Sequence, residues 1–137
     1  MSYKIQVIQA FEKAVRTLAK KYRSIKQDLE RAVNLLEKDP HIGVAIPGYE
    51  GAVWKLRVAN TSAKRGKQGG FRIIYLIEKE AHYCYLLTIY SKTEKTDVIP
   101  EEIEALLQSL EQEFFSDDSE AGEPDDAEAS ETLSKKR

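Results

Sequence analysis

The sequence has little of what disulfide-bonded proteins and metalloproteins need. Its 137 residues include one cysteine and two histidines. The cysteine, Cys84, lies in the apolar run 83–89, which favours a buried, reduced thiol over a disulfide scaffold. His41 and His82 stand apart without the spacing of metal ligands. We therefore predict neither a metal site nor a cofactor.

Long apolar segments are also missing. No run of membrane-spanning length occurs, and the N-terminus lacks the pattern of a signal peptide. We therefore expect a cytoplasmic protein with no membrane partner. The length is typical of one domain that can bury an ordinary core.

The formal net charge of −2 averages two unlike regions. Residues 116–137 hold eight acidic and three basic residues, a net charge of −5, whereas residues 1–115 carry +3. The last region is rich in Ser, Asp, Glu, Gly and Pro and too poor in apolar residues to build a core. We predict a folded domain over residues 1–115 and a disordered acidic tail over 116–137, which could compete with a polyanion for the basic part of the domain.

No acidic residue lies between Glu50 and Glu78, and six cations fall within residues 55–72. These cations are Lys55, Arg57, Lys64, Arg65, Lys67 and Arg72. An acid-free basic segment is the footprint expected of a protein that binds a phosphate backbone. A merely solvated surface loop is the alternative.

The basic segment begins as a strand. Trp54, Leu56 and Val58 alternate with Lys55 and Arg57, so the two cations share an exposed face and Trp54 is expected in the core. A turn follows, and the chain then enters a second strand that presents another arginine.

The periodicity predicts an α+β fold with a short N-terminal strand, a helical hairpin, a three-stranded antiparallel meander forming one small sheet, and a C-terminal helix. Ser24 and Gln27 form a capping-box signature at the start of the second helix, which should end near Asp39. Pro100 opens the last helix. The expected strands are 3–8, 53–59, 71–78 and 83–90, and the helices carry apolar residues within 11–22, 25–36 and 103–110.

Three motifs follow one another along the chain. They read Lys55-Leu-Arg57, then Gly69-Gly-Phe-Arg72-Ile-Ile-Tyr75, then Leu87-Thr-Ile-Tyr90-Ser-Lys92-Thr-Glu94-Lys-Thr-Asp97. In order and spacing they resemble the RelE/ParE superfamily of type II bacterial toxins, and within it the HigB-like branch. The resemblance covers residues 3–111. It implies a ribosome-dependent endoribonuclease that cleaves messenger RNA and is neutralised by a cognate antitoxin, one expected to carry a DNA-binding region.

RNA cleavage without metal uses the adjacent 2′-hydroxyl as nucleophile, so the protein must move protons and stabilise a pentacoordinate phosphorane. Preorganised cations suit the second task. We predict Arg57 and Arg72 as catalytic clamps, and Lys67, Tyr90 and Lys92 as candidates for proton transfer. The expected RNA-binding residues are Lys55, Lys64, Arg65, Gly69, Gly70 and Lys95, with the glycines allowing a close approach to phosphates.

No histidine lies in the three motifs, and Glu94 follows the last strand, so the general base is not identified. His41 and His82 are expected to be structural. Two other functions fit the same fold. One is a ParE-like poison of DNA gyrase, which the basic segment argues against. The other is an inactive module that binds RNA or an antitoxin.

Overall fold

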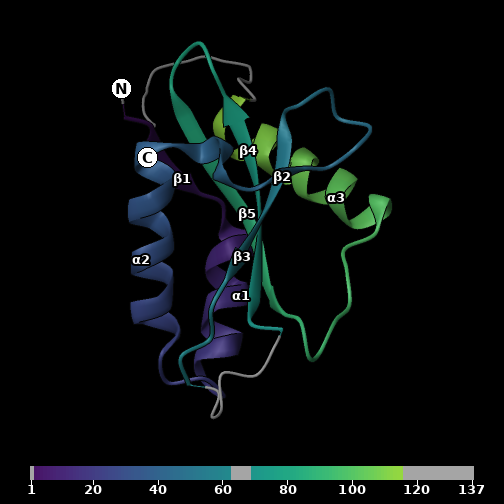
Figure 1. The fold of residues 1–137 in the computed structure, drawn as a ribbon. Coiled ribbons are helices and arrows are strands. Elements are labelled where there is room, and N and C mark those ends of the chain that lie inside the picture. Colours follow the sequence, from purple (N-terminus) through teal and green to yellow (C-terminus); the bar gives the residue numbers. More distant parts are fainter. Residues whose placement is uncertain (1, 63–68, 116–137) are drawn as a thin grey trace, which may run out of the picture.

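The computed structural model describes residues 2–62 and 69–115, which form an α+β fold (Figure 1). The elements are β1 (Lys4–Val7), α1 (Gln9–Ala19), α2 (Ile25–Lys38), the 3₁₀ helix η1 (Pro40–Ile42), β2 (Val44–Ala45), β3 (Val53–Val58), β4 (Phe71–Glu78), β5 (Tyr83–Ser91), α3 (Pro100–Leu110) and the π-helical turn η3 (Glu111–Phe115). The acidic tail, together with Lys64, Arg65 and Lys67 of the basic segment, lies outside the described residues.

The strands form one five-stranded sheet in the order β1-β5-β4-β3-β2. The predicted meander of β3, β4 and β5 is confirmed as antiparallel, and β1 pairs with β5 in parallel. The edge strand β2 was not predicted. Its two residues lie between Gly43 and Pro47 and are too few to show a period.

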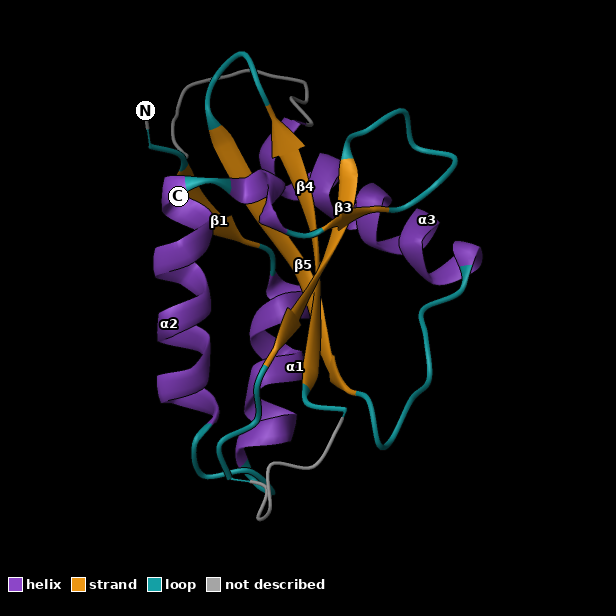
Figure 2. Ribbon diagram, viewed as in Figure 1, coloured by secondary structure: helices purple, strands orange, loops and turns teal. Residues whose placement is uncertain are grey.

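The helices lie on both sides of this sheet. The α1–α2 hairpin packs on one side and α3 lies on the other (Figure 2). The central strand β4 is covered on both faces, as predicted, since Ile73, Ile74 and Tyr75 are fully buried. None of the helices in the described part of the chain is both long enough and apolar enough to cross a membrane.

The N-terminal caps of α2 and α3 differ in how far they follow the sequence prediction. At α3, Pro100 is the first residue and the backbone N–H of Ile99 donates to the Glu102 carboxylate over 2.9 Å, as the sequence pattern indicates. At α2 the predicted capping box is wrong. The Ser24 hydroxyl donates to the buried Asp28 carboxylate over 2.7 Å and caps no backbone N–H. A neighbouring acceptor has taken the hydroxyl that the cap would have used.

Two further predictions concern the core. Cys84 is a free, fully buried thiol whose pKa is raised to about 12 by burial. Trp54 packs against the core from the expected face but stays half-buried. Its indole N–H donates to the carbonyl of Gly51 over 2.7 Å, and its ring meets His41 edge-on.

Candidate functional site

The sheet register places three of the predicted catalytic residues side by side. Arg57 on β3 is the direct partner of Arg72 on β4, which in turn is the direct partner of Tyr90 on β5. Side chains directly opposite in antiparallel strands point to the same face and interact. We call these three residues the arginine–tyrosine row. Lys55, two residues before Arg57 on β3, lies on the same face.

Electrostatics of the arginine–tyrosine row are unfavourable without an anion. Like charges directly opposite each other destabilise a sheet. Arg57 is exposed, and within residues 2–62 and 69–115 neither arginine forms an ion pair. The Arg72 guanidinium donates to the carbonyls of Gly69 and Phe71, which orient it without neutralising its charge. A bound phosphate would relieve the repulsion.

Tyr90 is linked to Asp97 and Lys55. Its hydroxyl donates to Oδ1 of Asp97 over 3.3 Å, and the Lys55 ammonium donates to the same oxygen over 3.3 Å. Burial, and secondly the charge of Asp97, raises the pKa of Tyr90 to about 12. Tyr90 is therefore a protonated donor at neutral pH. The pKa of Asp97 is lowered, chiefly because the backbone N–H of Val98 donates to its carboxylate.

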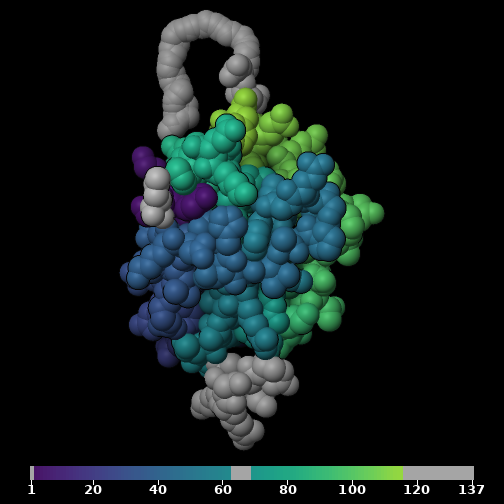
Figure 3. Space-filling view, turned by 45° about the horizontal axis from the view of Figure 1, so that its top comes forward, coloured from purple at the N-terminus to yellow at the C-terminus, as the bar shows by residue number. Residues whose placement is uncertain are grey.

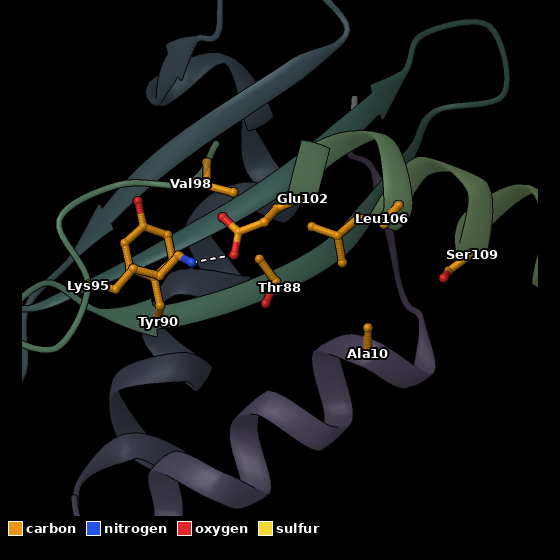
Figure 4. A pocket seen from close by; sticks show the side chains of 9 residues that line it. Ala10, Thr88, Tyr90, Lys95, Val98, Glu102, Leu106 and Ser109 are labelled. Carbon is orange, nitrogen blue, oxygen red and sulfur yellow. Dashed lines mark hydrogen bonds and ion pairs between the residues drawn. The ribbon is translucent and has the colours of Figure 1, made fainter. Parts of the chain in front are cut away.

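Tyr90 also lines an open, mostly apolar pocket of about 410 Å³ between β5, α1 and α3 (Figure 4). Lys95 reaches into this pocket and forms an ion pair with Glu102, whose pKa is lowered by the hydrogen bond from Lys95. Lys95 thus lies close to the arginine–tyrosine row, but its charge is already balanced. Ala10, Val98 and Leu106 are among its apolar lining residues.

Lys92 lies beside Gly69 and Gly70, the two residues before β4. The Lys92 backbone N–H donates to the carbonyl of Gly70 over 2.9 Å, and its ammonium donates to the carbonyl of Thr96. Gly70 has a φ of +58°, and a Cβ there would lie 2.4 Å from the Val58 carbonyl oxygen. Glycine at this position is therefore required by the close approach of β3, whatever it does for RNA.

The other acidic and imidazole side chains lie elsewhere. Glu94 pairs with Lys21 at 2.6 Å and accepts a hydrogen bond from Tyr22, so it is tied to the end of α1. His41 follows α2 and contacts Asp39. His82 lies in the turn before β5 with a φ of +62°.

Asp97 is the site residue that sequence reasoning missed. It follows β5 in a loop without periodicity, where no pattern tells which way a side chain points. Its one signal was its place at the end of the third motif. In the described part of the chain, no three His, Cys, Asp or Glu side chains lie close enough together to hold a metal ion.

Comparison with known proteins extends these observations. A family model described as the RelE toxin of RelE/RelB toxin–antitoxin systems matches residues 5–121. A mutant of the Escherichia coli toxin RelE in the free state aligns with a TM-score of 0.52 at 13% identity, covering 79% of this chain and 97% of that one. The RelBE2 toxin–antitoxin complex of Mycobacterium tuberculosis contains a chain that aligns with a TM-score of 0.51 at 15% identity, covering 66% of this chain and 99% of that one.

The structural likenesses confirm the predicted RelE-like fold. The resemblance to the RelE/ParE superfamily is also confirmed, while the HigB-like branch stays a prediction. Because the family model spans most of the sequence, the chain belongs to the RelE toxin family of type II toxin–antitoxin systems.

Proposed function

We propose that this toxin is a ribosome-dependent endoribonuclease that cuts messenger RNA by attack of the 2′-hydroxyl, without a metal ion. The family supports this, since RelE toxins are typically ribosome-dependent endoribonucleases. The observation that carries the proposal is the arginine–tyrosine row, in which a phenol and two guanidinium groups without an ion pair among the described residues share one sheet face.

In this proposal Arg57 and Arg72 stabilise the phosphorane. Both sit on strands, and the Arg72 guanidinium is already oriented by two carbonyls. Donors that are fixed before reaction need no reorganisation when charge develops in the transition state, and removing one such donor typically lowers the rate by about 10² to 10³.

Tyr90 is assigned the role of proton donor to the departing 5′-oxygen. Its raised pKa keeps it protonated, and general acids must carry a proton at the working pH. Asp97 is assigned as a positioning residue that holds the Tyr90 hydroxyl and the Lys55 ammonium. Its lowered pKa makes it a weak base. The other proton transfer, removal of the 2′-hydroxyl proton, is assigned to Lys92 or to Lys67. Of these two, Lys67 lies outside the described residues.

Two partners complete the proposal. Messenger RNA is held by Lys55 beside the row, by Lys95 once it exchanges Glu102 for a phosphate, and by Lys64, Arg65 and the Gly69–Gly70 turn as predicted from the sequence. A cognate antitoxin with a DNA-binding region controls the toxin. The structural neighbour from M. tuberculosis, itself a toxin–antitoxin complex, supports this second partner.

Primer extension on cellular messages after a short induction tests the activity. The wild-type chain should produce new 5′ ends inside coding sequences, and Arg57→Ala should produce none. Lys79→Ala removes an exposed cation from the β4–β5 turn and is the matched control, with cleavage expected at the wild-type level. Growth arrest without cleavage would refute the nuclease and point to a gyrase poison.

The chemical step has its own test. A message with a 2′-deoxy nucleotide at the cut position should resist cleavage on ribosomes, because it lacks the nucleophile. Cleavage of the control message should not require magnesium beyond what the ribosomes need to stay assembled. Cutting of the 2′-deoxy message would overturn the proposed mechanism.

A further inference from the structure

A small cavity lies on the same sheet face as the arginine–tyrosine row, beyond Lys55. It has a volume of about 170 Å³ and forms where β2 meets the loop that leads into α3. Its lining residues are Val44, Ala45, Ile46, Pro47, Lys55, Asp97 and Val98. Figure 3 shows the blue segment around β2 at the molecular surface, beside the green segment at the start of α3. We call this cavity the β2 pocket.

The strand register places the β2 pocket next to the row. Val44 is the cross-strand partner of Lys55, so the two side chains lie on one face of the sheet. Lys55 and Arg57 are two residues apart on β3, which separates them by roughly 7 Å. The pocket is therefore within reach of a nucleotide that adjoins a phosphate held by Arg57.

The walls of the β2 pocket are mostly apolar. Val44, Ile46, Pro47 and Val98 supply them, and Val44 is 67% exposed. The volume of about 170 Å³ is below the roughly 300 to 1,000 Å³ of sites for drug-sized molecules. A cavity of this size and character suits one flat ring system, such as a nucleobase.

The free edge of β2 adds a backbone donor and a backbone acceptor. The Ile46 N–H donates to the Val53 carbonyl over 2.9 Å, which makes these two residues a hydrogen-bonded pair. In an antiparallel ladder the neighbouring pair does not exchange hydrogen bonds, so the N–H and C=O of Ala45 point away from β3. Since β2 is the last strand of the described sheet, these two groups face outward at the pocket.

Asp97 adds a carboxylate oxygen. Its hydrogen bonds from Lys55, Tyr90 and the backbone N–H of Val98 all reach Oδ1. Within residues 2–62 and 69–115 no donor reaches Oδ2, and the side chain is 61% exposed. One oxygen of Asp97 therefore positions Tyr90, while the other can accept an N–H from a ligand in the β2 pocket.

We infer that the β2 pocket binds the base immediately downstream of the cut and selects bases that carry an amino group. The inference deepens the proposed function and rests on it. The departing 5′-oxygen belongs to the downstream nucleotide, and Tyr90, its proposed proton donor, is bonded to Asp97 in the wall of the pocket.

The selection follows from the chemistry of Oδ2. Adenine, cytosine and guanine each have an amino group that can donate to a carboxylate. Uracil offers only its ring N–H, which lies between two carbonyl oxygens that the carboxylate of Asp97 repels. Repulsion of the wrong ligand contributes to specificity as much as attraction of the right one.

Cleavage on ribosomes tests the selection, with four messages that differ only in the base after the cut. For the wild-type chain, KM should be more than about tenfold lower for each amino-bearing base than for uracil, because a hydrogen bond to a charged group is lost. In Asp97→Asn the new amide keeps its oxygen at the three donors and turns its NH₂ toward the pocket. The KM ratio should then fall below about threefold.

Tyr90→Phe is the matched control. It removes the hydroxyl that Asp97 holds but leaves the carboxylate in the pocket. It should lower kcat for all four messages by the same factor and leave the KM ratios unchanged, because base binding and proton transfer are separate steps. Equal KM values for the four messages in the wild-type chain, or an unchanged ratio in Asp97→Asn, would overturn the inference.

A binding measurement on the wild-type chain depends neither on cleavage nor on the folding of a variant. A short RNA with a 2′-deoxy nucleotide at the cut position carries either adenosine or an abasic residue after it. The adenosine RNA should shift the methyl NMR signals of Val44 and Ile46, and the abasic RNA should not. The same response to both RNAs would refute the pocket. Selective shifts in a chain that never cuts messages would refute only the nuclease.

Discussion

At the scale of single residues, the opposed arginines break a rule of sheet construction. Cross-strand partners stabilise a sheet when they attract each other, and Arg57 and Arg72 repel. Places where a sequence violates local rules are where function is expected. This repulsion lowers the stability of the protein without RNA, and a bound phosphate would remove it.

Arg57→Ala should therefore raise stability while it slows cleavage. We expect the free energy of unfolding to rise by about 0.2 to 1 kcal/mol, because a like-charge pair is removed. The cleavage rate should fall by about 10² to 10³. Urea unfolding and single-turnover cleavage on ribosomes measure the two effects. A variant that is both destabilised and active would contradict the assignment on both counts.

Tyr90 and Asp97 should behave as one unit. Tyr90→Phe and Asp97→Asn should each slow cleavage, and the double variant should be little slower than Tyr90→Phe alone, because Asp97 acts through the hydroxyl that Phe lacks. With the Tyr90 pKa raised to about 12, the rate should show no limb from Tyr90 between about pH 6 and 9. Additive losses in the double variant would show that Asp97 acts independently.

At the scale of elements, periodicity was a good guide where many residues share a pattern. The strands of the meander, the two-helix hairpin and the start of α3 were all predicted from it. Individual polar contacts were not predictable in this way. The Ser24 cap failed because Asp28, one helical turn further on, takes the hydroxyl, and Asp97 was missed because its loop has no periodicity. The pairing of Arg57 with Arg72 needed the register, which the sequence does not reveal.

One such contact joins α2 to the end of β3. The Asp28 carboxylate is buried and accepts from the Thr61 backbone N–H over 3.0 Å, the Thr61 hydroxyl over 2.7 Å and the Ser24 hydroxyl over 2.7 Å, and it pairs with Arg31. It therefore anchors the segment that leaves β3 to the first turn of α2.

Asp28→Ala should destabilise the fold by about 2 to 4 kcal/mol, since it leaves the Thr61 and Ser24 donors without their acceptor. Arg31→Ala is the matched control. It removes only the exposed partner of the carboxylate and should cost less. Urea unfolding of the wild-type chain, Asp28→Ala and Arg31→Ala measures these free energies. If Asp28→Ala lowers the free energy of unfolding by less than about 1 kcal/mol, water replaces the carboxylate.

At the scale of the whole molecule, charge differs along the chain, with −5 over residues 116–137 and +3 over residues 1–115. The described chain ends where Phe115 packs against Tyr85, with ring centroids 5.6 Å apart. Tyr85 lies five residues before Tyr90 on β5, or roughly 17 Å along the strand. Phe115, which the acidic segment 116–137 follows in sequence, therefore lies away from the arginine–tyrosine row.

A flexible chain of 22 residues would still span roughly 25 Å, which is enough to reach the row. We predict that truncation after Phe115 leaves the unfolding free energy unchanged and tightens RNA binding at low salt, because it changes the net charge from −2 to +3. The gain should shrink as salt screens the attraction. Equal affinities of the two proteins throughout a salt titration would make the segment a passive tail.

The order of strands in the sheet also sets when the site can form during synthesis. The row takes one residue from each of β3, β4 and β5, and β1 finds its parallel partner only in β5. While β5 is still inside the ribosome, β1 has no strand to pair with, and Tyr90 does not lie beside Arg57 and Arg72. Under the proposed function, the chain therefore cannot cut messages until β5 has emerged from the ribosome that makes it.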